Sequence, residues 1–415
     1  MNVLSLFSGC GGMDIGFEGG FICLKRSINQ KLHKDWITED FGKTVRVKPT
    51  GFNTIFANDI RADAKAAWVS YFQGKKENPN EVYHIDSIVD LVKRARAGED
   101  VFPKNVDIIT GGFPCQDFSI SGKRLGFASQ KSHNGGKLEA GEPSIESRGQ
   151  LYMWMRDVVS LVKPPLFIAE NVKGLTNLND VKEIIEQDFS TAADGGYLVV
   201  PAKVLHAADY GVPQSRERVI FFGFKKSLLK PEAAEALAQE EISTDYDPYP
   251  QKTHAFTVKK TGSLASPVLC KEVFEGLKEP KEAEDLSQKK YSGAKYMGKH
   301  CQGQTEINLD GIGPTIRSEH HGNIEYRRLS LEHGGKHLEE LSSGLQERRL
   351  SVRECARIQT FPDDYQFILP PIDGNVSVSA SDAYKIIGNA VPCVLAYNIA
   401  MGIKEKWNRY FVAEG

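Results

Sequence analysis

The sequence predicts an α/β protein with an open, mostly parallel sheet. In the first part of the chain, short apolar runs typical of buried strands alternate with segments that have the spacing of helices. This alternation is the pattern of βαβ units. The expected strands are residues 3–7, 53–58, 106–109 and 166–169, and the expected helices are residues 62–72 and 151–162.

Two later runs are expected to extend the sheet. Residues 197–205 and 218–224 are strand-like and close together in the sequence, which favours an antiparallel pair at one edge. Residues 25–51 separate the first two strands by more than a simple βα unit needs, and no structure is assigned to them. Residues 130–147 are polar and glycine-rich, and we expect a loop there.

The rest of the chain predicts a second domain and a return to the first. Residues 225–346 are rich in charge, Gly and Ser, with few long apolar runs, so we expect a smaller, irregular domain. Helical spacing returns at residues 351–359, and residues 383–399 are expected to form a strand, a turn and a helix. The main domain is therefore expected to comprise residues 1–224 and 347–415.

Composition is that of an ordinary globular protein. Of 415 residues, 40% are hydrophobic and 26% are charged. A long uncharged apolar run and the features of a signal peptide are both missing, so we expect a cytoplasmic protein without a membrane span. The seven cysteines are widely spaced, with no C-x-x-C pair, which argues against a metal site and for reduced thiols. Because the net charge is −2, nucleic-acid binding would need a local concentration of positive charge.

A glycine-rich turn follows the first strand. Gly9, Gly11 and Gly12 allow a tight turn and the close approach of a ligand to the backbone. Such a turn could bind NAD, a flavin or S-adenosylmethionine, or it could be a turn without a ligand. Asp59, after the second strand, is placed to accept hydrogen bonds from ribose hydroxyls, and Asp86 could accept one from an adenine amino group. Either aspartate could instead be a helix N-cap.

Three further motifs carry reactive groups. Cys115 follows the third strand on a turn that a ligand can reach, and Glu170 ends the fourth strand. Arg216 and Arg218 alternate on a strand-like run, so both could share one face. A thiolate, a carboxylic acid and two arginines suit nucleophilic attack on a pyrimidine ring. The alternatives are a buried structural cysteine, a salt-bridged or helix-capping glutamate and a solvated strand face.

Together these motifs resemble the DNA (cytosine-5) methyltransferase family of the bacterial restriction–modification type. The resemblance rests on P-C-Q around Cys115, E-N-V from Glu170, Q-x-R-x-R from Gln214, F-x-G-x-G-G from Phe7 and G-N-x-V from Gly388. It implies a Rossmann-like S-adenosylmethionine-dependent methyltransferase sheet with helices on both faces, plus a target-recognition domain at residues 225–346. It also implies base flipping, a covalent bond from the cysteine to cytosine C6, and methyl transfer to C5 in a specific double-stranded DNA sequence.

The resemblance assigns roles to individual residues. Cys115 is the expected nucleophile and Glu170 the acid near N3, while Arg216 and Arg218 hold cytosine O2 and orient the acid or the loop. The residues expected to bind S-adenosyl-L-methionine are Phe7, Gly9, Cys10, Gly12, Asp59, Ile60, Asp86, Ser87, Pro114, Leu151, Asn389 and Val391. The residues expected to contact DNA are Gln116, Ser119 and Ser121 in the loop after the cysteine, and Lys289, Lys290, Lys295, Arg317 and His320 in the recognition domain.

The resemblance further implies a monomer whose methylation protects host DNA from a cognate restriction endonuclease. A tRNA cytosine-5 methyltransferase would share the fold, with a smaller recognition region. A nucleotide-binding oxidoreductase would explain the glycine turn and Asp59, but not Cys115, Glu170 and the paired arginines. A DNA-binding protein without activity would not need the intact catalytic set. The motifs indicate neither the target sequence nor the base that removes the C5 proton.

Overall fold

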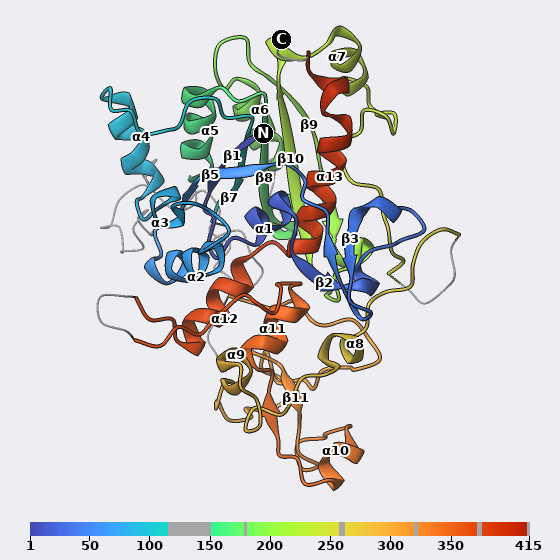
Figure 1. The fold of residues 1–415 in the computed structure, drawn as a ribbon. Coiled ribbons are helices and arrows are strands. Elements are labelled where there is room, and N and C mark those ends of the chain that lie inside the picture. Colours follow the sequence, from blue (N-terminus) through green and yellow to red (C-terminus); the bar gives the residue numbers. More distant parts are fainter. Residues whose placement is uncertain (115–150, 178–180, 257–261, 319–322, 372–375, 413–415) are drawn as a thin grey trace.

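The computed structural model describes residues 1–114, 151–177, 181–256, 262–318, 323–371 and 376–412. Its centre is a seven-stranded sheet with helices on both faces (Figure 1). In order across the sheet, the strands are β6 (Tyr83–His84), β5 (Asn53–Asn58), β1 (Asn2–Leu6), β7 (Ile108–Gly112), β8 (Leu166–Val172), β10 (Glu217–Lys225) and β9 (Tyr197–His206). The strands from β6 to β8 are parallel, and β10 is antiparallel to both of its neighbours. The predicted parallel sheet and antiparallel edge are confirmed.

Alternate side chains of the strands enter two apolar cores. Leu4, Ile109 and Phe167 face one core, and Val3 and Ile108 face the other. Strands buried on both faces appear in a sequence as continuous apolar runs, which is why they were recognisable. The first core is covered by α4 (Ile88–Arg96), α5 (Leu151–Val162) and α6 (Val181–Ser190), and the second by α1 (Gly12–Glu18), α2 (Ala62–Phe72) and α13 (Cys393–Tyr410). The short helix α3 (Pro79–Val82) leads into β6.

Residues 383–399 are helical, so the predicted strand there was wrong. They belong to α12 (Ala380–Asn389) and α13, which are separated by a short turn. Ser379 begins α12 with a capping box, since its hydroxyl accepts from the Asp382 N–H and the Asp382 carboxylate accepts in return. Pro392 caps α13 and favours an extended residue before it. The apolar run that resembled a strand is the buried face of a helix, and short apolar runs do not distinguish the two.

The unassigned segment between the first two strands forms a small sheet of its own. Its strands are β2 (Ile22–Leu24), β3 (Ile37–Asp40) and β4 (Thr44–Val47), all antiparallel, with β4 in the middle. Trp36, just before β3, is buried and packs edge-on against Tyr397 of α13. The segment therefore adds a layer over the C-terminal helix and leaves the central sheet unchanged.

The lower part of the molecule in Figure 1 has little regular structure. It is held together by buried arginines: Arg328 pairs with Glu279 and Glu340, and Arg348 pairs with Glu279 and Glu354. Glu354, the last of these glutamates, lies on α11 (Val352–Ile358), so the ion pairs connect the lower part to the main body. The elements of this part are α8 (Cys270–Phe274), α9 (Leu286–Lys289), β11 (Tyr326–Arg328), α10 (Leu338–Ser342) and β12 (Arg348–Arg349), followed by α11 (Val352–Ile358).

The start of the predicted irregular domain packs on the main body. Helix α7 (Pro231–Leu237) buries Ala233 and Leu237 in the same core as α13. Tyr249 reaches the backbone oxygen of Ile220 on β10 with its hydroxyl, at 2.8 Å. The chain therefore leaves the main body well after residue 225.

One stretch of the described chain is apolar and long enough to span a membrane. It is Ala380–Tyr410, and 83% of its apolar window is buried inside the molecule. The core helices of soluble proteins have the same length and composition, so this stretch is weak evidence for a membrane span.

Candidate active site

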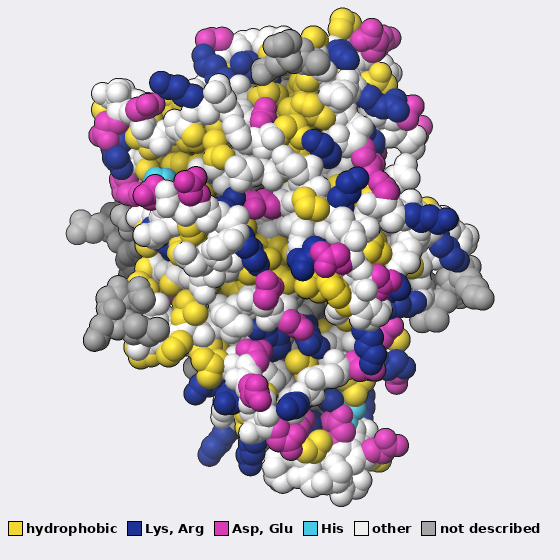
Figure 2. All heavy atoms as spheres, in the orientation of Figure 1, with side chains coloured by type: hydrophobic (Ala, Val, Ile, Leu, Met, Phe, Trp, Pro, Cys, Tyr) yellow, Lys and Arg dark blue, Asp and Glu magenta, His cyan; other side chains and the backbone are white. Residues whose placement is uncertain are grey.

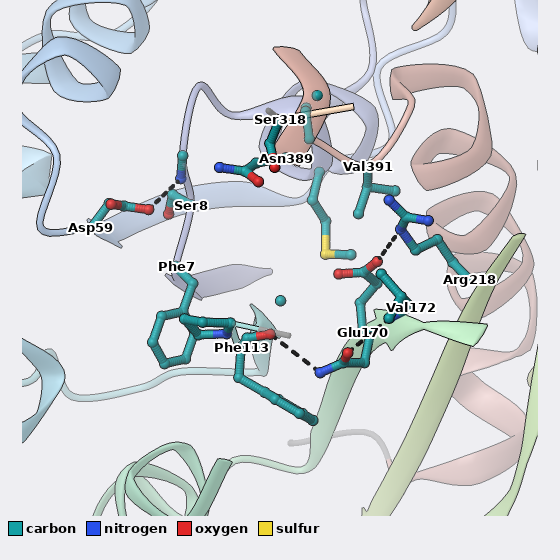
Figure 3. Close-up of a pocket in the computed structure, with 18 of the residues that line it drawn as sticks. Phe7, Ser8, Asp59, Phe113, Glu170, Val172, Arg218, Ser318, Asn389 and Val391 are labelled. Carbon is teal, nitrogen blue, oxygen red and sulfur yellow. Dashed lines mark hydrogen bonds and ion pairs between the residues drawn. The ribbon is translucent and has the colours of Figure 1, made fainter. Parts of the chain in front are cut away.

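A cavity of about 780 Å³ opens at the carboxyl ends of the parallel strands. Open α/β sheets bind ligands at this edge, because the turns after several strands meet there. Figure 3 shows Asp59 and Ser8 at one end of the cavity, and Glu170 with Arg218 at the other. Residues 388–391, at the end of α12 and in the turn that follows it, line another side of the cavity.

The glycine turn after β1 is shaped for close packing. Phe7 and Gly9 both have φ of 53°, and Gly11 has φ of 79°, which is the left-handed region that glycine tolerates best. A side chain at Gly12 would place its Cβ 2.2 Å from the Val391 carbonyl oxygen. Glycine at this position therefore allows the C-terminal turn to lie against the first helix and to share the cavity wall.

Asp59 holds this turn in place. One carboxylate oxygen accepts from the Gly9 N–H at 3.1 Å and the other from the Arg61 N–H at 3.0 Å. Burial raises the pKa of Asp59, and the two backbone hydrogen bonds oppose that rise. A carboxylate at a strand end beside a glycine turn is the arrangement that binds ribose hydroxyls. The polar groups at the Asp59 end of the cavity therefore fit the adenosyl part of S-adenosylmethionine.

Most residues predicted to bind the cofactor do line the cavity, but two do not. Cys10 is fully buried, and its thiol lies 3.2 Å from the Ile386 carbonyl oxygen, in the core on the other side of the turn. Asp86 is directed toward Arg94, at 4.0 Å, and the neighbouring Ser87 and Ile88 line the cavity instead. Neither residue is among those that line the cavity, and their contact with the cofactor stays a prediction. The predicted residues that do line it are Phe7, Gly9, Gly12, Asp59, Ile60, Ser87, Pro114, Leu151, Asn389 and Val391.

Glu170 and Arg218 form an ion pair at the other end of the cavity. The Arg218 Nε lies 2.7 Å from Glu170 Oε1, and both side chains are about nine-tenths buried. A Cβ on Gly112 would lie 2.7 Å from the other carboxylate oxygen, so glycine makes room for the acid beside β7. Burial raises the pKa of Glu170, while Arg218 and Arg216 oppose the rise. The acid is thus held next to the strand that leads to Cys115.

Asn171 holds the segment between β7 and Cys115. Its Nδ2 donates to the Phe113 carbonyl oxygen at 3.2 Å, two residues before Cys115. Cys115, Gln116, Ser119, Ser121 and His320 lie outside the described residues.

The Arg216 side chain binds backbone oxygens. Its guanidinium donates to the carbonyl oxygens of Ile316 at 3.0 Å, Gly388 at 2.8 Å and Ala390 at 2.9 Å. Gln214 accepts from the Ile316 N–H at 3.2 Å. The two arginines therefore differ: Arg218 orients the acid, and Arg216 joins the C-terminal turn to the segment that contains residue 316.

That segment is a part of the site that the motifs did not identify. Thr315, Ile316 and Ser318 line the cavity together with Arg317, although they lie in the predicted recognition domain. Arg317, predicted to contact DNA, forms an ion pair with Glu325 at 2.6 Å. The first arginine of Q-x-R-x-R, Arg216, is a sequence signal for such a segment. A buried guanidinium needs several hydrogen-bond acceptors, and the backbone carbonyls of a neighbouring segment can supply them.

The lysines predicted to contact DNA are at the surface. Lys289 ends α9, Lys290 follows it, and Lys295 lies on the next stretch of chain; all three are exposed. Figure 2 shows several Lys and Arg side chains on this lower part of the molecule. Among the described residues, no cluster of three His, Cys, Asp or Glu side chains could hold a metal ion.

The fold and the site define an α/β enzyme that binds a nucleoside-containing cofactor at one end of a cavity and holds an acid–arginine pair at the other. The chain belongs to the C-5 cytosine-specific DNA methylase family, whose model matches residues 1–405. It is therefore a DNA cytosine-5 methyltransferase that takes the methyl group from S-adenosyl-L-methionine. The predicted family, activity and cofactor are confirmed.

Relatives match along nearly the whole chain. The Type II methyltransferase M.BsuRI of Bacillus subtilis is 31% identical, over 97% of this chain and 79% of its own length. M.NgoPII of Neisseria gonorrhoeae is 29% identical, over 99% of this chain and 97% of its own. Two solved structures share the fold at 20% identity or below. One is a putative DNA modification methyltransferase encoded within a prophage of E. coli (TM-score 0.51, 98% of this chain and 99% of that one). The other is the S. pombe Dnmt2 methyltransferase (TM-score 0.53, 98% of each chain).

Proposed function

We propose that this enzyme methylates one cytosine in a specific double-stranded DNA sequence, with Cys115 as nucleophile and Glu170 as acid. The observation that carries the proposal is the buried Glu170–Arg218 pair beside β7, because this strand leads into Cys115. The other cysteines support it by their surroundings. Among the described cysteines, Cys301 is partly exposed and the others are buried, and burial raises the pKa of every buried one. A buried thiol of raised pKa is a poor nucleophile.

The chemistry requires both groups. Cytosine C5 is too weak a nucleophile to attack a methyl group directly, so the thiolate first adds to C6 and a C6–S bond forms. Negative charge then builds at N3, where Glu170 supplies a proton or a hydrogen bond. The bound cofactor supplies an electrophilic methyl group on a sulfonium. After C5 has gained the methyl group, it loses its proton to a base and the C6–S bond breaks. The thiolate and the double bond are then restored, and any proton that N3 took from Glu170 returns to it.

The target cytosine must leave the DNA duplex to reach this cavity. Unstacking and unpairing cost a few kcal/mol, and the cavity must recover that energy by contacts to the flipped ring. Arg218, held by Glu170, is the arginine that we assign to the cytosine end. We assign Arg216 a positioning role, because its donors already bind three backbone carbonyls.

Asp59→Ala should weaken S-adenosylmethionine binding by about 10- to 100-fold, because hydrogen bonds to a charged group contribute roughly 1.5–3 kcal/mol and Asp59 also holds the Gly9 N–H. Titration calorimetry with the cofactor measures the change. Asp90→Ala, at an exposed carboxylate on α4, is the matched control. DNA affinity should stay unchanged in both variants. An Asp59→Ala protein that binds the cofactor normally would remove Asp59 from the site.

We propose a recognition domain of residues 276–346, shorter than the predicted 225–346, since residues 226–255 pack on the main body. Exchanging residues 276–346 for the segment of a relative with another target should transfer the target preference. The exchange should leave the cavity intact, because Gln214 and Arg216 hold residue 316 by its backbone atoms. Bisulfite sequencing of methylated plasmid gives the preference of the chimera. An unchanged preference would contradict the domain assignment. Within this recognition domain, the exposed Lys289, Lys290 and Lys295 are proposed to contact phosphates.

We further propose a cytoplasmic monomer that protects host DNA from a cognate restriction endonuclease. The relatives named as Type II methyltransferases support this role. The test incubates the protein with S-adenosylmethionine and unmethylated plasmid, followed by bisulfite sequencing. Protected cytosines in one short repeated context support the proposal. If tRNA is methylated and the plasmid is not, the RNA alternative replaces the proposal.

A further inference from the structure

A chain of hydrogen bonds runs from the cofactor end of the cavity into the core. Ser8, which lines the cavity, lies with its Oγ 2.8 Å from Ser5 Oγ. Ser5 donates to Asp14 Oδ1 at 2.6 Å, and the Trp68 Nε1–H donates to Asp14 Oδ2 at 2.8 Å. Ser5, Asp14 and Trp68 are at most 2% exposed. In Figure 3, Ser8 lies on the turn beside Asp59. The chain therefore connects a buried carboxylate to the wall of the cavity.

The Asp14 carboxylate sets the donor and acceptor of each hydrogen bond between Ser8, Ser5 and Asp14. An ionised aspartate only accepts hydrogen bonds, so Ser5 must give its single hydrogen to Asp14. Ser5 can then only accept from Ser8, which turns its hydrogen inward, where the Ser5 carbonyl oxygen also lies at 3.1 Å. One lone pair of Ser8 accepts from the Asn58 N–H at 3.3 Å. The other lone pair remains for a donor in the cavity.

The buried carboxylate is costly where it lies. Asp14 has two neutral donors, and the charged groups acting on it, Glu18 and Lys76, are paired with each other at 2.6 Å. Burial raises the pKa of Asp14 to about 6, against the effect of its two hydrogen bonds. A neutral asparagine of the same shape would avoid burying a charge. A costly charge beside a ligand cavity is a candidate for a functional role.

We propose that Asp14 is a positioning residue for the cofactor: through Ser5 it holds the Ser8 hydroxyl as an acceptor for a hydrogen-bond donor of S-adenosylmethionine. The proposal rests on the assignment of this end of the cavity to the cofactor. The donors of matching chemistry are a ribose hydroxyl and the amino-acid ammonium. The demethylated product has the same groups, so a change in this hydrogen-bond network should alter the affinities for S-adenosylmethionine and for the product alike.

Asp14→Asn tests the direction of the chain without changing its shape. Because Trp68 Nε1 can only donate, the amide oxygen of the asparagine must face it, and the amide nitrogen must then donate to Ser5. Ser5 turns its hydrogen toward Ser8, whose two lone pairs are then occupied by Ser5 and Asn58. The cavity loses an acceptor while every buried group keeps a partner.

The measurement is titration calorimetry with S-adenosylmethionine on wild type, Asp14→Asn, Ser8→Ala and the double variant. Each single variant should raise the Kd by about 3- to 10-fold, the effect of one hydrogen bond. The double variant should bind no more weakly than Ser8→Ala, since both changes remove the same acceptor. The melting temperature of Asp14→Asn at pH 8 should equal or exceed that of wild type, which separates positioning from a structural role.

Two outcomes would overturn the proposal: an unchanged Kd in Asp14→Asn, or a double variant whose Kd rises by the product of the single effects. A Ser5→Ala background gives a second test, because Ser8 then donates only to the carbonyl oxygen of residue 5, and Asp14→Asn should no longer change the Kd. Failure of the cofactor assignment itself is distinguishable, since Asp59→Ala would then also bind S-adenosylmethionine as wild type does.

Discussion

Cys115→Ala should abolish methyl transfer while leaving DNA and cofactor binding intact. The alanine cannot form the C6–S bond, and without that bond C5 does not become nucleophilic. Loss of a nucleophile that starts a covalent pathway lowers the rate by at least roughly 10³-fold. The measurement is transfer of a labelled methyl group to plasmid DNA, with gel-shift and calorimetric binding in parallel. Cys301→Ala, at a partly exposed cysteine, is the matched control and should keep normal activity.

Covalent capture gives an independent readout of the same residue. With S-adenosylmethionine present, DNA with 5-fluorocytosine at the target should trap wild type as a stable adduct. After methyl transfer C5 carries fluorine and no proton that a base could remove, so the C6–S bond persists. Cys301→Ala should be trapped in the same way, and Cys115→Ala should not. Appreciable turnover or trapping of Cys115→Ala would mean that another group attacks C6.

The sequence predicted the sheet well for a physical reason. Parallel strands are buried on both faces and so appear as short, uninterrupted apolar runs, such as residues 55–57 and 166–169. The prediction of a strand within residues 383–399 was wrong for a related reason. The buried face of a helix in an apolar stretch has the same composition as a buried strand. The small antiparallel sheet between the first two strands gave no signal, since its short strands alternate with charged residues and depend on packing against α13.

The site was predictable where one residue type determines the chemistry, and less so where a residue works through its neighbours. Asp59 follows β5 and Glu170 lies near the carboxyl end of β8, and both line the cavity as expected. Cys10 and Asp86 were placed by their position in a motif, but local packing directs their side chains elsewhere. The role of Arg216 depends on carbonyl groups at residues 316, 388 and 390, far away in the sequence. Spacing along the chain holds no information on such partners.

The same limit applies to the network below the cavity. Asp14 in the sequence is one acidic residue in the first turn of a helix, where a carboxylate is ordinary. Only the fold places it between Ser5 and Trp68, out of reach of water. A residue that influences a ligand through two others leaves no local pattern, and tertiary structure is needed to find it.

Glu170→Gln should lower kcat by about 10²- to 10⁴-fold, the usual contribution of general acid catalysis, and should leave cofactor affinity unchanged. The amide keeps the shape beside Gly112 and can donate a hydrogen bond to N3, but it cannot transfer a proton. Burial raises the pKa of Glu170, so the acid keeps its proton to higher pH than an ordinary glutamate does. The wild-type rate should therefore fall as pH rises through that raised pKa, because the carboxyl group then loses the proton that it supplies at N3.

In Glu170→Gln this fall at high pH should disappear, because the remaining activity no longer depends on a titrating acid. The measurement is kcat/KM across pH for both proteins, with Glu183→Gln on the exposed face of α6 as the matched control. Loss of the Arg218 ion pair should contribute separately, since a neutral amide holds the guanidinium less firmly. If the descending limb persisted in Glu170→Gln, or if kcat stayed within a factor of two, the proton at N3 would have to come from another group.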